Sequence, residues 1–207
     1  MLSAPPLPFD AVCFDLDGTL AEVRRRRLGM WRSALRHPRI LLTFGEVVEE
    51  LRGLRLPDLD AELCRRLARR ADLPPAIVTR VLREEIDGRW PQLFAGARPP
   101  PAVARLLQRV DALGLPRAVV SDHPAVEKLT AMGLGGWSAV LCCRDLGALK
   151  PLPDALYAAA AQLGVPVGRV LMVGDRDDTD GRMAAAAGAR FVHVDALTDG
   201  ADPLASA

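Results

Sequence analysis

The chain has 207 residues, half of them hydrophobic, and a formal net charge of +1. This length fits one or two domains, and the hydrophobic content is enough for a buried core. Because the charge is nearly balanced, no global field favours nucleic acid or a membrane surface, and we expect neither as a partner. The four cysteines show no disulfide framework, and no signal peptide or transmembrane run is evident, so we expect a cytoplasmic protein.

A hydrophobic run near the start is followed directly by two carboxylates. Ala11–Phe14 has the continuous apolar character of a buried parallel strand, and Asp15 and Asp17 follow it at spacing i, i+2. In an extended chain this spacing puts both side chains on the same side. Gly18 lets the backbone turn, and Thr19 adds a hydroxyl. An ordinary acidic turn would look the same, so this stretch alone leaves both interpretations open.

Residues 21–95 differ in composition from the rest of the chain. They are rich in Arg and Leu at helical spacing, with few strand signals and an excess of basic over acidic residues. Helices are expected to begin at Asp58 and after Pro74, the second ending at Gly88. The charge asymmetry predicts a separate helical subdomain inserted after the first strand. Its arginine run, 24–27, either binds an acidic substrate or forms a solvated basic face, and we favour the latter.

From residue 97 onward, helices and strands alternate. Short apolar strands are expected at 118–120, 139–141, 170–173 and 191–194, separated by helices over 103–113, 125–132, 154–163 and 180–188. This alternation indicates an α/β protein with a doubly wound parallel sheet. The last residues, 199–207, are expected to form a loose tail.

Polar residues follow three of the predicted strands, at the edge where open α/β sheets bind ligands. They are Asp15, Asp17, Ser121, Asp122 and Asp175. A lysine, Lys150, lies before the helix that leads to the fourth strand. Carboxylates suit a hard cation, whereas a hydroxyl, backbone amides and a lysine suit an anion.

These residues resemble the motifs of phosphatases in the haloacid dehalogenase (HAD) superfamily. Residues 15–19 match D-x-D-G-T, Ser121 matches the second motif, Lys150-Pro151 the third, and residues 174–180 the fourth, G-D-x-x-x-x-D. They occur in the family's order, and the match covers about residues 9–20 and 96–194. The resemblance implies a Rossmann-like catalytic core over 1–20 and 96–207, with a small helical cap of the C1 type over 21–95.

The resemblance also implies a role for the matched acids. Asp15 would be the nucleophile that forms an aspartyl-phosphate, and Asp17 the general acid and then the general base. Mg²⁺ would be held by the Asp15 carboxylate, the Asp17 carbonyl oxygen and the Asp175 carboxylate. Asp180 would bind a metal-bound water from the second shell.

The implied phosphate-binding set is Gly18, Thr19, Ser121, Asp122 and Lys150. Ser121 and the backbone amides of Gly18 and Asp122 would bind phosphoryl oxygens, and Lys150 would neutralise their charge. His123 follows two positions after Ser121, and either contacts the substrate or serves only as a helix-entry residue.

The acid at position 17 favours ester hydrolysis over dehalogenation, because a halide leaves without being protonated. We therefore expect Mg²⁺-dependent hydrolysis of a small phosphorylated metabolite. A phosphomutase on the same scaffold is one alternative. A non-catalytic binding module is another, although its usual sign is the loss of a catalytic acid, and Asp15, Asp17 and Asp175 are all present.

Overall fold

A five-stranded parallel sheet forms the centre of the protein, in the strand order β3-β2-β1-β4-β5. The structure is a computed structural model that describes residues 7–22 and 27–205. The strands are β1 (Ala11–Phe14), β2 (Arg117–Ser121), β3 (Ala139–Cys142), β4 (Val170–Gly174) and β5 (Arg190–His193). Because β1 lies in the middle, the residues that follow it have a neighbouring strand end on each side.

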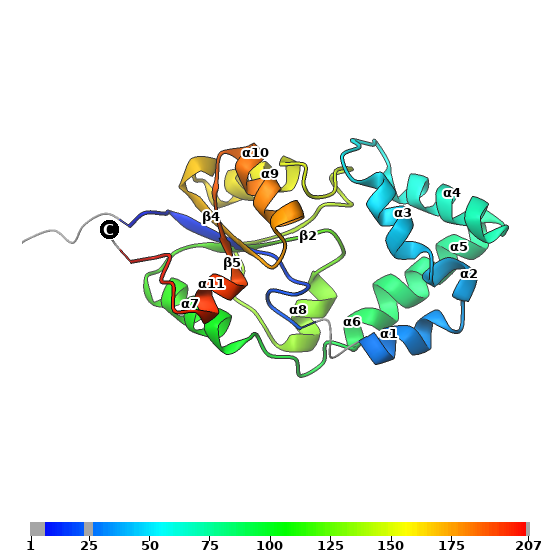
Figure 1. Cartoon of the computed structure of the whole chain (residues 1–207), viewed down its shortest axis with the longest axis horizontal. Coiled ribbons are helices and arrows are strands. Elements are labelled where there is room, and N and C mark those ends of the chain that lie inside the picture. Colours follow the sequence, from blue (N-terminus) through cyan, green and yellow to red (C-terminus); the bar gives the residue numbers. More distant parts are fainter. Residues whose placement is uncertain (1–6, 23–26, 206–207) are drawn as a thin grey trace, which may run out of the picture.

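Helices cover both faces of this sheet, which confirms the doubly wound α/β prediction (Figure 1). One face carries α9 (Asp154–Leu163) and α10 (Arg182–Ala187), and the other carries α7 (Pro101–Ala112), α8 (Val126–Met132) and α11 (Val194–Thr198). Along β1, Ala11 and Cys13 pack on the first side, and Val12 and Phe14 on the second. All four are fully buried, which explains why β1 is apolar throughout rather than alternating.

The segment between β1 and α7 is helical and lies beyond one end of the sheet (Figure 1). It contains α1 (Arg27–Ala34), α2 (Pro38–Leu41), α3 (Phe44–Leu51), α4 (Leu59–Ala71), α5 (Pro75–Val81), the π-helix η2 (Leu82–Arg89) and α6 (Trp90–Gln92). We call it the insert. The boundary of the insert at residues 20 and 95 stays a prediction, and Arg24, Arg25 and Arg26 lie outside the described residues.

Two expected helix starts in the insert are confirmed, and one helix end is wrong. The Asp58 side chain accepts a hydrogen bond from the Ala61 amide at 2.8 Å and caps α4. The helix that begins at Pro75 does not stop at Gly88 but continues as η2 and α6. Burial of Leu82 and Ile86 on this segment outweighs the cost of a helical glycine, which is about 1 kcal/mol.

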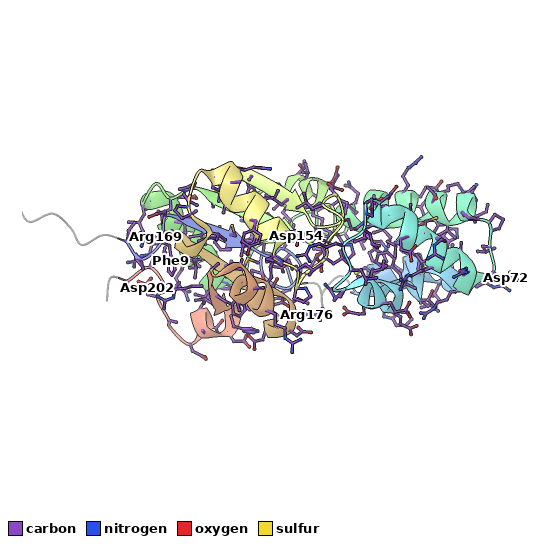
Figure 2. The ribbon with its side chains drawn as sticks, turned by 90° about the horizontal axis from the view of Figure 1, so that it is seen from above. Phe9, Asp72, Asp154, Arg169, Arg176 and Asp202 are labelled. Carbon is purple, nitrogen blue, oxygen red and sulfur yellow. The ribbon has the colours of Figure 1, made fainter. Side chains whose placement is uncertain are left out.

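The insert packs against the sheet through apolar and charged contacts. One hydrophobic cluster runs from the insert to the face of the sheet under α9. Arg144, which follows β3, pairs with Asp60 at 2.6 Å and with Asp87 at 3.1 Å. Figure 2 shows Asp154 and Arg176 at this junction, with Asp72 at the tip of the insert.

The remaining segments are short. They are the 3₁₀-helix η3 (Val167–Arg169) and the π-helix η4 (Asp177–Gly181). Because η4 leads directly into α10, the helical segment expected at 180–188 begins earlier, at Asp177. The expectation of a loose tail is wrong as far as residue 205, because Leu204 is buried and Asp202 pairs with Arg109 at 2.7 Å.

All four cysteines are free thiols, and burial raises the pKa of Cys13 to about 12, which favours packing over redox chemistry. Within the described ranges, none of the helices has the length and apolar character needed to cross a bilayer.

Candidate active site

The strand ends bring most of the predicted site residues to one cavity of about 140 Å³. Its lining includes Asp15, Asp17, Ser121, Asp122, His123, Lys150, Asp175 and Asp180. Gly18 and Thr19 are the two predicted residues outside this lining. A larger cavity of about 500 Å³ lies between α4, α5 and Arg144 and holds none of the predicted residues. The chemistry, rather than the cavity volume, therefore locates the candidate site.

Asp15 follows β1 and is enclosed by other charged groups. Its Oδ1 accepts a hydrogen bond from Lys150 Nζ at 2.6 Å, while its Oδ2 is buried and has no hydrogen-bond partner among the described residues. Burial raises the pKa of Asp15 to about 8, although Lys150 acts in the opposite direction. Asp15 therefore has one oxygen fixed by a cation and one left for a ligand or a reaction.

Lys150 joins two of the acids. Its Nζ donates to Asp15 at 2.6 Å and to Asp180 Oδ1 at 2.7 Å, and its side chain is only 2% exposed. Burial acts to lower the pKa of Lys150, but the carboxylates of Asp15 and Asp180 prevail and raise it well above its usual value. The lysine is therefore charged. Its direct contact with Asp180 was not indicated by the sequence.

The acids form a group that could hold a cation. Ligand atoms of Asp15, Asp175 and Asp180 all lie within 4.8 Å of one another. Three carboxylates and the unpartnered Asp15 Oδ2 fit a hard divalent ion such as Mg²⁺. The Asp17 carboxylate is outside this group, and the prediction assigned only its carbonyl oxygen to the metal.

Gly18 makes room for this group. Its φ is +106°, and a Cβ at this position would lie 2.0 Å from Asp175 Oδ2. Its amide donates to the Ala21 carbonyl at 2.9 Å, and the use of this amide for phosphate binding stays a prediction. Thr19 is fully buried and outside the lining of the cavity, and its role in phosphate binding stays a prediction.

The residues at the end of β2 connect the cavity with the insert. Ser121 Oγ accepts a hydrogen bond from the His123 amide at 3.3 Å. The Asp122 carboxylate accepts from the Lys150 amide at 3.0 Å and from Arg52 Nη1 at 2.7 Å. Although burial alone would raise the pKa of Asp122, the charges of Lys150 and Arg52 lower it. Asp122 is therefore held as a carboxylate between two segments.

His123 lines the cavity and packs against the insert. Its ring lies 5.6 Å from the ring of Phe44 in α3, and its Nδ1 is buried without a partner among the described residues. Burial lowers the pKa of His123 to about 4, and the charge of Lys128 acts in the same direction. The imidazole is therefore neutral at neutral pH.

Two residues of the site were missed by the sequence interpretation. Arg52, directly after α3, donates to Asp122 and to the Lys150 carbonyl, at 2.7 and 2.6 Å. Lys128, in α8, places its Nζ 2.5 Å from Asp17 Oδ2. The sequence did carry one signal for Lys128, because only two of the 27 lysine and arginine residues in the chain are lysines. The other is Lys150.

Comparisons with known proteins identify the family of this chain. A family model described as haloacid dehalogenase-like hydrolase matches residues 9–188. A glyceraldehyde 3-phosphate phosphatase from Methanopyrus kandleri is 30% identical over 200 residues, which cover 89% of this chain and 83% of that protein. An N-acetylmuramic acid 6-phosphate phosphatase from Pseudomonas aeruginosa is 36% identical over 110 residues. That match spans about half of each protein, 50% of this chain and 49% of the relative.

Solved structures show the same fold. A β-phosphoglucomutase from Clostridium difficile matches with a TM-score of 0.68 at 15% identity, covering 89% of this chain and 84% of that chain. At this identity the likeness concerns the fold alone. The family model, by contrast, covers most of the chain, and one relative is similar over nearly the full length. The chain therefore belongs to the haloacid dehalogenase-like hydrolases.

Proposed function

We propose that the protein is a Mg²⁺-dependent phosphatase that hydrolyses a small phosphate monoester through an aspartyl-phosphate on Asp15. The observation that carries the proposal is the environment of Asp15, with one oxygen bound to Lys150 and the other unpartnered. Asp17 lies two residues further on in the same cavity. The names of the two curated relatives support phosphate esters as substrates.

In the first step, Asp15 Oδ2 forms a bond to phosphorus while the bond to the ester oxygen breaks. Asp17 gives a proton to that oxygen, so the product leaves as an alcohol. Lys150 neutralises charge on Asp15 and on the phosphoryl group. Ser121 and the Asp122 amide bind phosphoryl oxygens, as the sequence predicts.

In the second step, Asp17 takes a proton from a water molecule, whose oxygen attacks phosphorus. The bond from phosphorus to Asp15 breaks, so inorganic phosphate is released and the Asp15 carboxylate is restored. Asp180 keeps Lys150 oriented during both steps, through its contact at 2.7 Å. A Mg²⁺ ion held by Asp15, Asp175 and the Asp17 carbonyl would supply positive charge that offsets the repulsion between an anionic nucleophile and an anionic phosphate.

The substrate class follows from the size of the cavity and from the relatives. A volume of about 140 Å³, lined mostly by charged side chains, suits a phosphoryl group and a short polar remainder. The relatives are named for glyceraldehyde 3-phosphate and N-acetylmuramic acid 6-phosphate. We therefore infer a small phosphorylated metabolite of the sugar type. The cytoplasmic location stays a prediction from the sequence.

The nucleophile assignment is tested with Asp15→Asn. We expect phosphate release from 4-nitrophenyl phosphate and from a panel of sugar phosphates with Mg²⁺, and a loss of about 10³-fold or more in the variant. Asp72→Asn, at the tip of the insert, is the control and should match the wild type (Figure 2). Equal rates in Asp15→Asn and wild type would disprove the proposal.

The alternatives give different products. A phosphomutase would return a rearranged phosphate ester with no inorganic phosphate, which chromatography of the products would show. A non-catalytic module would give neither product, and the absence of Mg²⁺ binding in calorimetry would favour it.

A further inference from the structure

Both lysines of the chain are buried, and each contacts one acid of the first motif. Lys150 is 2% exposed and pairs with Asp15, and Lys128 is 7% exposed and pairs with Asp17. The proposed function uses Lys150 but gives Lys128 no part. Nearly every other basic position in the chain holds arginine, which makes a second buried lysine at the site unusual for this sequence.

We propose that Lys128 is a positioning residue that fixes the Asp17 carboxylate for proton transfer. This assignment rests on the proposed function, in which Asp17 protonates the leaving alcohol. Lys128 holds Asp17 Oδ2 at 2.5 Å, and Asp17 Oδ1 is buried without a partner among the described residues. One oxygen is thus anchored, and the other is the one left to exchange a proton.

The surroundings of Lys128 keep its ammonium group in place. Its neighbour in α8, Leu129, is buried in the hydrophobic cluster on that side of the sheet, as is Met132. Its Nζ lies 5.0 Å from the centroid of the Phe94 ring, over which a cation is favourably placed. Because the lysine side chain is held in place, its ammonium group restricts the rotamers of the Asp17 side chain. The orientation of a catalytic group strongly affects the rate of the reaction.

Lys128 does not fit the role of a phosphate ligand. It is absent from the lining of the cavity, whereas its partner Asp17 belongs to that lining. A lysine also differs from an arginine here, because its compact ammonium makes a single-point contact with one carboxylate oxygen, whereas a guanidinium tends to engage both. A single-point contact leaves Asp17 Oδ1 unused.

A purely structural ion pair would have different consequences. Removing such an ion pair would lower the stability of the protein, or would weaken the binding of all substrates to the same extent. The loss of a positioned general acid instead lowers the rate by an amount that depends on the leaving group. Esters whose alcohols are poor leaving groups need the proton, and esters with good leaving groups need it less.

The experiment compares kcat/KM for phenyl phosphate and for 4-nitrophenyl phosphate, because the nitrophenolate leaves readily without a proton. In Lys128→Met, which keeps side-chain length but removes the charge, we expect about a 10- to 100-fold loss with phenyl phosphate and only a few-fold loss with 4-nitrophenyl phosphate. Glu127→Gln, an exposed neighbour in α8, is the control and should leave both values unchanged. Circular dichroism checks that the variants are folded.

A double-mutant cycle separates positioning from an independent effect. Asp17→Asn with Lys128→Met should lose no more activity than Asp17→Asn alone, because Lys128 acts through Asp17. Additive losses, or equal losses with both esters, would overturn the proposal. If Lys128→Met does not fold, Lys128→Arg takes its place in the same comparison, and a leaving-group dependence equal to that of the wild type overturns the proposal.

Failure of this inference differs from failure of the proposed function. If the wild type releases no phosphate, or Asp15→Asn retains the activity, the function itself is wrong. If Asp15→Asn is inactive and the two esters still lose activity equally in Lys128→Met, only the assignment of Lys128 is wrong.

Discussion

At the scale of single residues, two aspartates two positions apart have different surroundings. Asp15 is almost fully enclosed, contacts Lys150 and belongs to the carboxylate group with Asp175. Asp17 is 25% exposed, contacts Lys128 and remains outside that group. The proposed difference in role, nucleophile against proton carrier, therefore has a physical basis in their partners.

Mg²⁺ affinity should depend on pH through Asp15. Since burial raises the pKa of Asp15 to about 8, protons compete with a cation for this carboxyl group up to about that pH. A cation must displace the proton, so affinity should rise with pH between about 6.5 and 8.5, by up to about tenfold per pH unit. Titration calorimetry in buffers of different ionisation enthalpy measures both the affinity and the released proton. A constant Kd over this range would contradict the prediction.

Gly18→Ala should weaken metal binding. The added Cβ would meet the Asp175 carboxylate, and a φ of +106° is strained for alanine by about 1–3 kcal/mol. Displacement of Asp175 should lower Mg²⁺ affinity by at least about tenfold, as measured by calorimetry. Gly45→Ala is the matched control, because a Cβ added there would meet nothing within 4 Å and the φ of Gly45 is not positive. Unchanged affinity in Gly18→Ala would show that Asp175 does not bind the ion.

At the scale of elements, two arginines reach from the loop after α3 to the core. Arg52 has a side chain that is 14% exposed and pairs with Asp122, whereas Arg55 is 60% exposed and pairs with Asp154. The two ion pairs differ in burial, although their nitrogen-to-oxygen distances are similar, at 2.7 and 2.9 Å. Burial should therefore determine how much each ion pair stabilises the junction between insert and core.

Arg52→Ala should lower the free energy of unfolding by about 1–3 kcal/mol, because it removes the guanidinium that pairs with the enclosed Asp122 carboxylate at 2.7 Å. Arg55→Ala should cost less than about 1 kcal/mol, since solvent screens that pair. Urea unfolding of both variants measures the difference. Equal effects would mean that Arg52 does not bear on the stability of the junction.

How well each element was predicted depends on the range of the interactions that form it. The strands were placed to within a residue or so, because an apolar run reports burial on both faces of a parallel sheet. The continuation through Gly88 was missed, because packing of Leu82 and Ile86 outweighed a local helix-end signal. The contact of Lys128 with Asp17 joins residues 111 positions apart, and that of Arg52 with Asp122 joins residues 70 apart. Neither leaves a local pattern in the sequence.

At the scale of the whole molecule, insert and core share one hydrophobic cluster on the α9 side of the sheet. Leu63 and Leu67 of the insert belong to the same buried cluster as Leu156 of the core. A continuous cluster of this kind favours unfolding as one unit rather than in two stages.

We therefore expect a single cooperative unfolding transition. Trp137 lies beside Phe14 in the core, so Trp137→Phe leaves Trp31 and Trp90 as fluorescent reporters of the insert. In this variant, the fluorescence midpoint in urea should coincide with the far-ultraviolet circular dichroism midpoint. An earlier fluorescence transition would show that the insert unfolds first.

The scarcity of lysine has a spectroscopic consequence. Since the chain holds only two lysines, and each touches a different aspartate of the first motif, ¹⁵N labelling of the lysine Nζ atoms alone gives an NMR spectrum with two signals. One signal reports on the ammonium beside Asp15 and the other on the ammonium beside Asp17. Ligand binding and each half of the reaction can thus be followed at both acids in one experiment, with no probe attached to the protein.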